Sequence, residues 1–270
     1  MNFTNLITTS FLALFFASCT EIIDISTNAA ESQLVVEANI AMNETASVFL
    51  SKSIGLNEPN NFEMVGGATV RITDNTGKTE VLTEMSKGFY NSNAIKGEVG
   101  KTYTLTIESD NQIITSECKI PTYVPIDSFT VVNSIFPGGG PPRANQEAPF
   151  YEIKLKYTDP ANEQNFYRIV MYYNGTIQAR NSIFDDKFTN GKQMESVVIL
   201  FNDTAKVKDK ISIELQSIDY QVYNYFASMG NSAMGPGNAS SPANPYTNLN
   251  GAILGYFSAH TIERKEWILN

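Results

Sequence analysis

Two residues near the C-terminus have the types and spacing of a nucleophile and its base. Ser258 and His260 lie two positions apart, and residues i and i+2 of a β-strand share a face, so their side chains can meet. A catalytic triad also needs an acid that orients the imidazole and a sharp turn that presents the serine. The sequence has no G-x-S-x-G motif. We therefore expect Ser258 and His260 to be structural.

Carboxylates in predicted turns are the candidates for binding a metal ion. Asp74-Asn75, Asp159 and Asp185-Asp186 supply oxygen ligands of the kind that calcium prefers. None of them fits the EF-hand spacing, and aspartates in turns commonly accept hydrogen bonds from their own backbone. One histidine and two cysteines also exclude histidine-based zinc sites and cysteine clusters. We predict turns here, with no metal and no cofactor, and keep calcium binding as the alternative.

The first cysteine has the surroundings of a lipid attachment site. Residues 1–18 carry no charged side chain and contain an apolar stretch of the length found in secretory signal peptides, too short to span a bilayer. Cys19 follows Ala17 and Ser18, as in the lipobox of bacterial lipoproteins, although Phe16 stands where Leu is preferred. We expect cleavage before Cys19, acylation of that residue and stable anchoring through several acyl chains. An ordinary signal peptide is the alternative.

The second cysteine, Cys118, would then be the one free thiol of the mature chain and could form no intramolecular disulfide. It lies in a segment that alternates polar and apolar residues. A single cysteine in such a setting is usually a small buried hydrophobic residue. We predict that Cys118 is inert.

The composition limits the class of protein to which these residues can belong. The chain has 270 residues, of which 42% are hydrophobic and 17% are charged, so it can bury a core and make one large or two small domains. A net charge of −9 argues against nucleic acid as a partner. No segment after residue 18 is an apolar stretch long enough to cross a membrane.

The first half of the mature chain predicts an immunoglobulin-like antiparallel β-sandwich. After a polar tether, residues 19–32, short segments with period-two alternation follow one another from 33 to 120. They are separated by turn signals such as Asp74-Asn75-Thr76-Gly77, in which Asn and Gly accept turn geometry.

Two prolines mark a predicted domain boundary at residues 121–126. Pro121 and Pro125 cannot join a central ladder of a sheet. Alternating segments then resume, and residues 126–270 predict a second, larger antiparallel β domain that ends in two closing strands, near 252–259 and 264–269.

One short helix is expected near residues 219–229. Asp219 is a suitable N-cap and Gly230 a suitable residue after the last turn. The apolar residues recur at i, i+3, i+4 and i+7, which predicts a stripe that faces the core. The stripe consists of Val222, Tyr225, Phe226 and Met229.

The second region also has the features of a contact surface. Its long irregular insertions, 136–149 and 230–250, are rich in Gly, Pro and Asn, and long loops on a rigid scaffold often carry binding residues. We predict that a partner binds these loops, and disordered surface segments are the alternative. Tyrosines nearby suit interfaces that are partly wet, although filling a large core explains them equally well. They are Tyr151, Tyr157, Tyr167, Tyr172, Tyr173, Tyr220, Tyr223, Tyr225 and Tyr256.

The order of several short motifs resembles a family of uncharacterised outer-membrane lipoproteins of Bacteroidota, a domain of unknown function. The motifs are Cys19-Thr20-Glu21, Ile23-Asp24-Ile25, residues 34–38, 67–74, 88–90, 100–107, 125–128, 165–168, 248–252 and 255–257. Members are typically encoded beside TonB-dependent receptors, which implies an accessory of an outer-membrane transporter. Thr20-Glu21 resembles the surface-export signal of these bacteria and implies the cell surface, with the periplasmic leaflet as the alternative. The resemblance implies no catalytic residues.

The sequence thus predicts a non-enzymatic, lipid-anchored surface protein of the outer membrane that serves as a binding subunit of a TonB-dependent receptor for an unknown ligand. A structural or adhesive envelope lipoprotein is the main alternative. A hydrolase that uses Ser258 and His260 is the third hypothesis.

Overall fold

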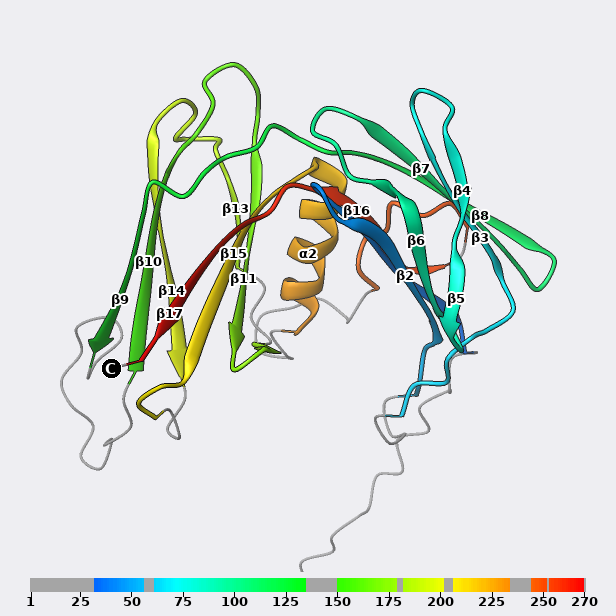
Figure 1. Ribbon diagram of the computed structural model, residues 1–270, viewed down its shortest axis with the longest axis horizontal. Coiled ribbons are helices and arrows are strands. Elements are labelled where there is room, and N and C mark those ends of the chain that lie inside the picture. Colours follow the sequence, from blue (N-terminus) through cyan, green and yellow to red (C-terminus); the bar gives the residue numbers. More distant parts are fainter. Residues whose placement is uncertain are drawn as a thin grey trace, which may run out of the picture. The chain divides into compact units, whose positions relative to one another are not determined.

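The computed structural model describes residues 32–55, 61–134, 150–178, 182–201, 206–233, 244–251 and 253–269. The predicted signal peptide, Cys19 and the insertion 136–149 lie outside these residues, as does the tether apart from Ser32. The described part of the chain contains seventeen strands and one helix, so the fold is mainly β, as the sequence predicts (Figure 1).

Strands β1 to β8, together with β16, build two sheets that share one core. In β3 and β7 every second residue is buried, because alternate side chains of a strand point to opposite faces. Val36, Val48, Ile72 and Leu105 from both sheets meet in this first core. The sheet orders are β16-β1-β2-β6-β5 and β4-β3-β7-β8. The bounds are β1 (Leu34–Ala41), β2 (Thr45–Lys52), β3 (Thr69–Asp74), β4 (Thr79–Val81), β5 (Thr83–Ser86), β6 (Phe89–Lys96), β7 (Thr102–Ser109), β8 (Gln112–Lys119) and β16 (Leu254–His260).

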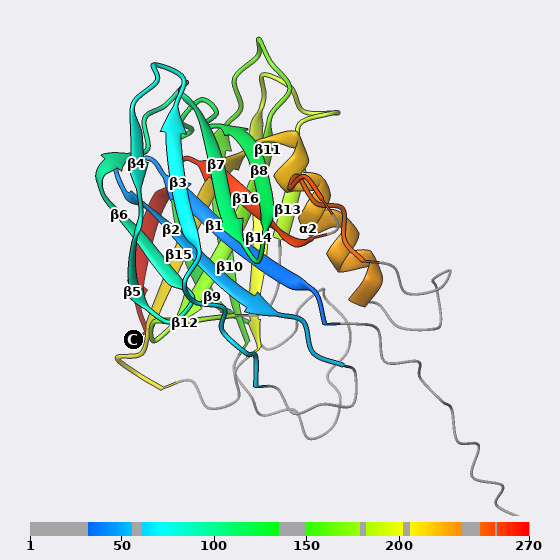
Figure 2. The ribbon, with the colours of Figure 1, turned by 90° about the vertical axis from the view of Figure 1, so that its right-hand side faces the viewer.

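Strand β16 corrects the prediction for the C-terminal segment, which we expected to be an antiparallel strand of the second domain. It pairs with β1 instead, and the pairing is parallel, with Gly255 opposite Val36 (Figure 2). The approach is so close that a Cβ on Gly255 would lie 1.9 Å from the carbonyl oxygen of Val36, and the φ of Gly255 is +103°. Glycine is therefore required for β16 to enter this sheet.

The remaining strands build a second pair of sheets around a second core. Ile153 of β10, Ile169 of β11, Val198 of β14 and Ile213 of β15 are among its buried residues. One sheet has the order β14-β10-β9 and the other β12-β11-β15-β17, with β13 also paired to β11. The bounds are β9 (Ser128–Ser134), β10 (Phe150–Thr158), β11 (Phe166–Tyr173), β12 (Thr176–Ile177), β13 (Ser182–Asp185), β14 (Gln193–Phe201), β15 (Lys210–Ile218) and β17 (Glu263–Ile268).

The chain between β8 and β9, where we predict a domain boundary, belongs to no strand. Ile120 is buried in the first core and Val124 in the second, so the change of core falls at Pro121. Residues 32–270 nevertheless form one compact unit, and β16 ties the C-terminal segment to the first sheet. The division into 33–120 and 126–270 stays a prediction.

Helix α2 (Tyr220–Ala233) begins as the sequence predicts and ends later. The Asp219 carboxylate accepts a hydrogen bond from the backbone N–H of Val222 at 2.9 Å, the N-cap interaction. Gly230 lies inside the helix, so the expected end at residue 229 is wrong: the helical hydrogen-bonding pattern continues through the three residues after it.

The predicted stripe of α2 is core. Val222 and Phe226 are buried in the first core, and Tyr225 and Met229 pack against it. Burying each of the two former side chains contributes about 1.5–3 kcal/mol. The helix lies against β11, β13 and β16 (Figure 1). No helix in the described part of the chain is long and apolar enough to cross a membrane.

Candidate functional site

Ser258 and His260 lie on one face of β16 and form the contact that their spacing predicts. Ser258 Oγ is 2.9 Å from Nδ1 of His260. Both side chains are buried, with exposed fractions of 2% and 4%. The serine therefore lies within a strand of a sheet, whereas a catalytic serine needs an accessible turn.

The electrostatic surroundings of His260 oppose a role as a general base. Burial, together with the positive charges of Arg168 and Arg264, lowers its pKa to about 3, against a partial rise from a hydrogen bond with the Ser258 backbone. A triad histidine must accept a proton and is stabilised as imidazolium by a neighbouring acid. His260 is neutral at pH 7 and faces cations instead.

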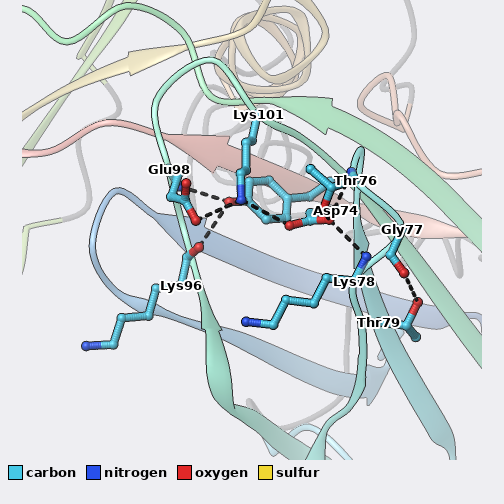
Figure 3. A network of polar contacts seen from close by, with 9 residues as sticks. Asp74, Thr76, Gly77, Lys78, Thr79, Lys96, Glu98 and Lys101 are labelled. Carbon is cyan, nitrogen blue, oxygen red and sulfur yellow. Dashed lines mark hydrogen bonds and ion pairs between the residues drawn. The ribbon is translucent and has the colours of Figure 1, made fainter.

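The predicted turn at Asp74 is confirmed, and hydrogen bonds occupy its carboxylate (Figure 3). One oxygen accepts from the backbone N–H groups of Thr76 and Lys78, both at 3.0 Å, and from the Thr76 hydroxyl at 2.6 Å. Lys101 Nζ lies 3.1 Å from the other oxygen. These bonds, that of the Thr76 hydroxyl foremost, hold the pKa of Asp74 well below its usual range.

The same network extends to the chain before β7. Lys101 Nζ also donates to Glu98 at 2.8 Å, and the hydrogen bonds to Glu98 and Asp74 raise the pKa of Lys101 to about 12 (Figure 3). The Tyr103 hydroxyl accepts from the backbone N–H of Glu98 and donates to the carbonyl of Lys96. Asp74 thus fixes a turn against a neighbouring loop.

Asp159 and Asp186 are also engaged by protein donors, whereas Asp185, which we expected in a turn, is the last residue of β13. Asp159 accepts from the Tyr167 hydroxyl and from the backbone N–H of Gly191. Asp186 accepts from the backbone N–H of Asn165 at 3.0 Å. Among the described residues, no three side chains of the types His, Cys, Asp and Glu are grouped so that they could hold a metal ion.

Cys118 is a buried free thiol that joins three elements. Its Sγ donates to the Asp219 carboxylate at 3.2 Å and accepts from the backbone N–H of Ala259 at 3.1 Å. Burial and the negative charge of Asp219 raise the pKa of this thiol well above its usual value. A thiol held in its protonated form is a weak nucleophile, which agrees with the predicted inert role.

Several of the tyrosines in the second region pack in the second core or between α2 and the strands beside it. Tyr157 and Tyr167 meet edge to face in the second core, with ring centroids 5.0 Å apart. Tyr225 of α2 packs on Tyr256 of β16 at 4.8 Å. Tyr220 is exposed, and its ring packs against that of Phe166. These rings mainly fill packed regions of the protein. This is the alternative that the sequence analysis kept open beside a role at an interface.

The predicted contact loops are described only in part. Of the insertion 230–250, residues 230–233 belong to α2 and residues 244–250 are described. Within the latter, Asn248 exchanges hydrogen bonds with the backbone of Phe257 at 2.7 and 3.0 Å. Its carbonyl accepts from the Ser116 hydroxyl at 2.8 Å. This stretch is thus anchored to β8 and β16, and partner binding by the loops stays a prediction.

A polar cleft lies between the faces of two sheets that point away from their own cores. Asn39 and Ser47 line it from β1 and β2, and His260 lines it from β16. The opposite wall consists of residues from β11, β12, β15 and β17, including Arg168 and Gln216. Its volume is about 250 Å³. We name this space, with these lining strands, the cleft.

A chain of charged and amide groups crosses the cleft wall. Arg264 donates to Glu214 from Nε and to Glu44 from Nη1, each at 2.7 Å. Gln216 donates to the other oxygen of Glu214 at 3.0 Å. These bonds raise the pKa of Arg264, the bond to Glu214 most of all. The network fixes side chains of β15 and β17 in one arrangement.

Arg168 continues this wall toward the helix. Its guanidinium carbon lies 3.9 Å from the centroid of the Phe226 ring, a cation–π contact. Its Nη1 donates to Gln216 at 3.4 Å. Burial lowers the pKa of Arg168, while the negative charge of Glu214 acts in the opposite direction.

The sequence analysis did not single out these cleft residues. The available signal was the alternation of β15, where Glu214 and Gln216 occupy the positions opposite to the apolar Ile213 and Leu215. Both polar side chains are nevertheless only 5% exposed. Polar residues at alternate positions usually predict a solvated face, and here that face is covered.

The fold and the cleft define a β-sandwich protein with a polar cleft between two sheets. The chain belongs to the family described as a domain of unknown function, DUF4249, which matches residues 20–266. No curated protein matches the chain. Among solved structures, the chain is similar at 14% identity to a DUF4785 family protein of Legionella pneumophila, with a TM-score of 0.19. That likeness covers 68% of this chain and 51% of the other.

Proposed function

We propose that the protein is a non-catalytic lipoprotein of the outer membrane, anchored through Cys19 at the cell surface, that serves as an accessory binding subunit of a TonB-dependent receptor. The lipobox-like sequence supports the anchor, and the family resemblance supports the receptor as partner. The ligand that the pair would take up is a separate question.

The observation that carries the non-catalytic part is the setting of His260. It is the chain's one histidine, its pKa is lowered to about 3, and the nearby charges of Arg168 and Arg264 disfavour its protonation. Ser258 lies beside it within a strand. A base with this pKa removes a proton from a serine hydroxyl poorly at neutral pH. The cleft, in contrast, is a concave space in which polar side chains converge with Tyr172 and Tyr256, as in sites that hold small molecules.

The test is purification of the protein from detergent-solubilised outer membrane of the cells that make it. We expect a β-barrel receptor of the TonB-dependent class to co-purify in stoichiometric amount. A Cys19→Ala variant should leave the membrane fraction and lose the receptor. Repeated purifications of the lipidated protein without any barrel partner would refute the accessory role.

An exposed aromatic pair favours a second candidate, a structural or adhesive envelope protein. Phe49 of β2 and Phe89 of β6 stack with ring centroids 4.5 Å apart, and Phe49 is 40% exposed. Exposed apolar surface of this kind can contact another protein. A deletion strain separates the two candidates: lost uptake supports the accessory role, whereas normal uptake with altered attachment or envelope integrity supports the structural one.

A further inference from the structure

The cleft is lined by polar side chains that are buried although they belong to neither hydrophobic core. Glu214, Gln216 and His260 are each 5% exposed or less, yet all three line it. Polar groups are costly to bury, and Arg264, Gln216 and Ser258 supply hydrogen-bonding partners for these side chains. The cleft itself is open to solvent at Ile177, which is 53% exposed. At about 250 Å³ it is smaller than the pockets of about 300–1,000 Å³ that hold drug-sized molecules. The space therefore suits a molecule of about one ring.

The formal charges that line the cleft cancel. Arg168 and Arg264 supply two positive charges, and Glu44 and Glu214 supply two negative ones. Arg264 forms ion pairs with both carboxylates at 2.7 Å. His260, whose pKa lies near 3, adds no charge at pH 7. A site without net charge offers little electrostatic attraction to an ion of either sign.

The hydrogen-bonding groups of the lining are mixed in kind. Guanidinium groups only donate, carboxylates only accept, and the amides of Asn39 and Gln216 do both. Tyr172 and Tyr256 add aromatic surface with a hydroxyl. Such a set matches ligand hydroxyls, each of which donates and accepts. An apolar ligand would form no hydrogen bonds with these groups.

From the volume, the balanced charge and the mixed donors and acceptors, we propose that the cleft binds a small uncharged polyhydroxylated molecule, of the class of a single sugar ring. The inference rests on the proposed role as a binding subunit and names the chemical class of its ligand. Binding requires no covalent step and no metal.

The experiment is ligand-observed saturation-transfer NMR on the purified lipoprotein in detergent. The neutral probes are glucose, galactose and N-acetylglucosamine, and the charged comparison probes are glucuronate and glucosamine. We expect saturation transfer to at least one neutral probe and weaker transfer to its charged counterpart.

Two cleft variants and one matched control locate the binding. Ser47→Phe places a ring in the cleft, and Ser51→Phe places the same ring on the same face of β2 outside it. Asn39→Ala is the milder cleft variant, to be used if Ser47→Phe fails to fold by thermal melting. Each cleft variant should weaken binding at least about tenfold, and Ser51→Phe should leave it unchanged.

The proposal is overturned if no neutral probe binds, if charged probes bind better, or if binding survives in the cleft variants. Its outcome is separate from that of the receptor test, because the NMR measurement needs no receptor. If the protein binds a sugar but no barrel co-purifies, the sugar site is supported and the accessory role is refuted. If a barrel co-purifies but no sugar binds, the accessory role is supported and the sugar site is refuted.

Discussion

Replacing Gly255 by alanine tests the parallel pairing of β16 with β1, the contact that joins the C-terminal segment to the first sheet. The new Cβ would lie 1.9 Å from the carbonyl oxygen and 2.7 Å from the carbonyl carbon of Val36. Both are backbone atoms in the middle of a sheet, so no side chain can rotate away. Accommodation requires the two strands to separate.

The expected loss has two parts. An alanine at a φ of +103° costs about 1–3 kcal/mol in backbone strain, and inserting a methyl group into packed structure costs about 1–3 kcal/mol more. The free energy of unfolding should therefore fall by about 2–6 kcal/mol. Gly77→Ala is the matched control, since Gly77 has a φ of +89° and nothing within 4 Å of its added Cβ. It should lose only the strain part, about 1–3 kcal/mol.

Urea unfolding followed by far-UV circular dichroism measures both losses, with the midpoint shift read at an unchanged slope. The difference between the two variants isolates the contact with Val36. Equal losses for Gly255→Ala and Gly77→Ala would refute the close approach of β16 to β1, and with it the entry of β16 into the first sheet.

Four further predictions concern individual side chains. Burial lowers the pKa of His260 to about 3 from about 6.5 in the unfolded chain, so stability should fall as the pH drops below 6.5, by about 2 kcal/mol at pH 5; His260→Asn should remove this part of the pH dependence in urea titrations. Asp219→Ala removes the N-cap of α2 and should cost about 1 kcal/mol in thermal unfolding, whereas Asp219→Asn should retain most of it. The pKa of Asp74 is held low by the Thr76 hydroxyl and its neighbours; the stabilisation is present above the ordinary value of about 4 and lost as the pH falls below it, and NMR titration of the carboxyl carbon should show no midpoint in the ordinary range. Mass spectrometry of the mature N-terminus should find acyl chains on Cys19, and an unmodified residue 19 at the start of the mature chain would contradict lipidation.

The sequence by itself determined the features that depend on neighbours a few residues apart. Alternation within residues 33–120 predicted short strands, and β3 and β7, with alternate residues buried, are among those that the structure confirms. Asp74 predicted a turn and Asp219 a helix start, because each side chain bonds to backbone within four residues. Ser258 and His260 meet for the same local reason, since a strand places i and i+2 on one face.

Only the tertiary structure decided which faces meet. Alternation shows that Gln216 and Glu214 share a face of β15, but not that β16 of the first sheet lies against β15, so burial of this polar face could not be predicted. The ion pair of Arg264 with Glu44 joins residues 220 positions apart, and Cys118 meets Asp219 across 101 positions. β16 likewise pairs with a strand from the start of the fold rather than with its sequence neighbours. Such pairings depend on the packing of whole sheets, and a period-two pattern is the same for a strand in either sandwich.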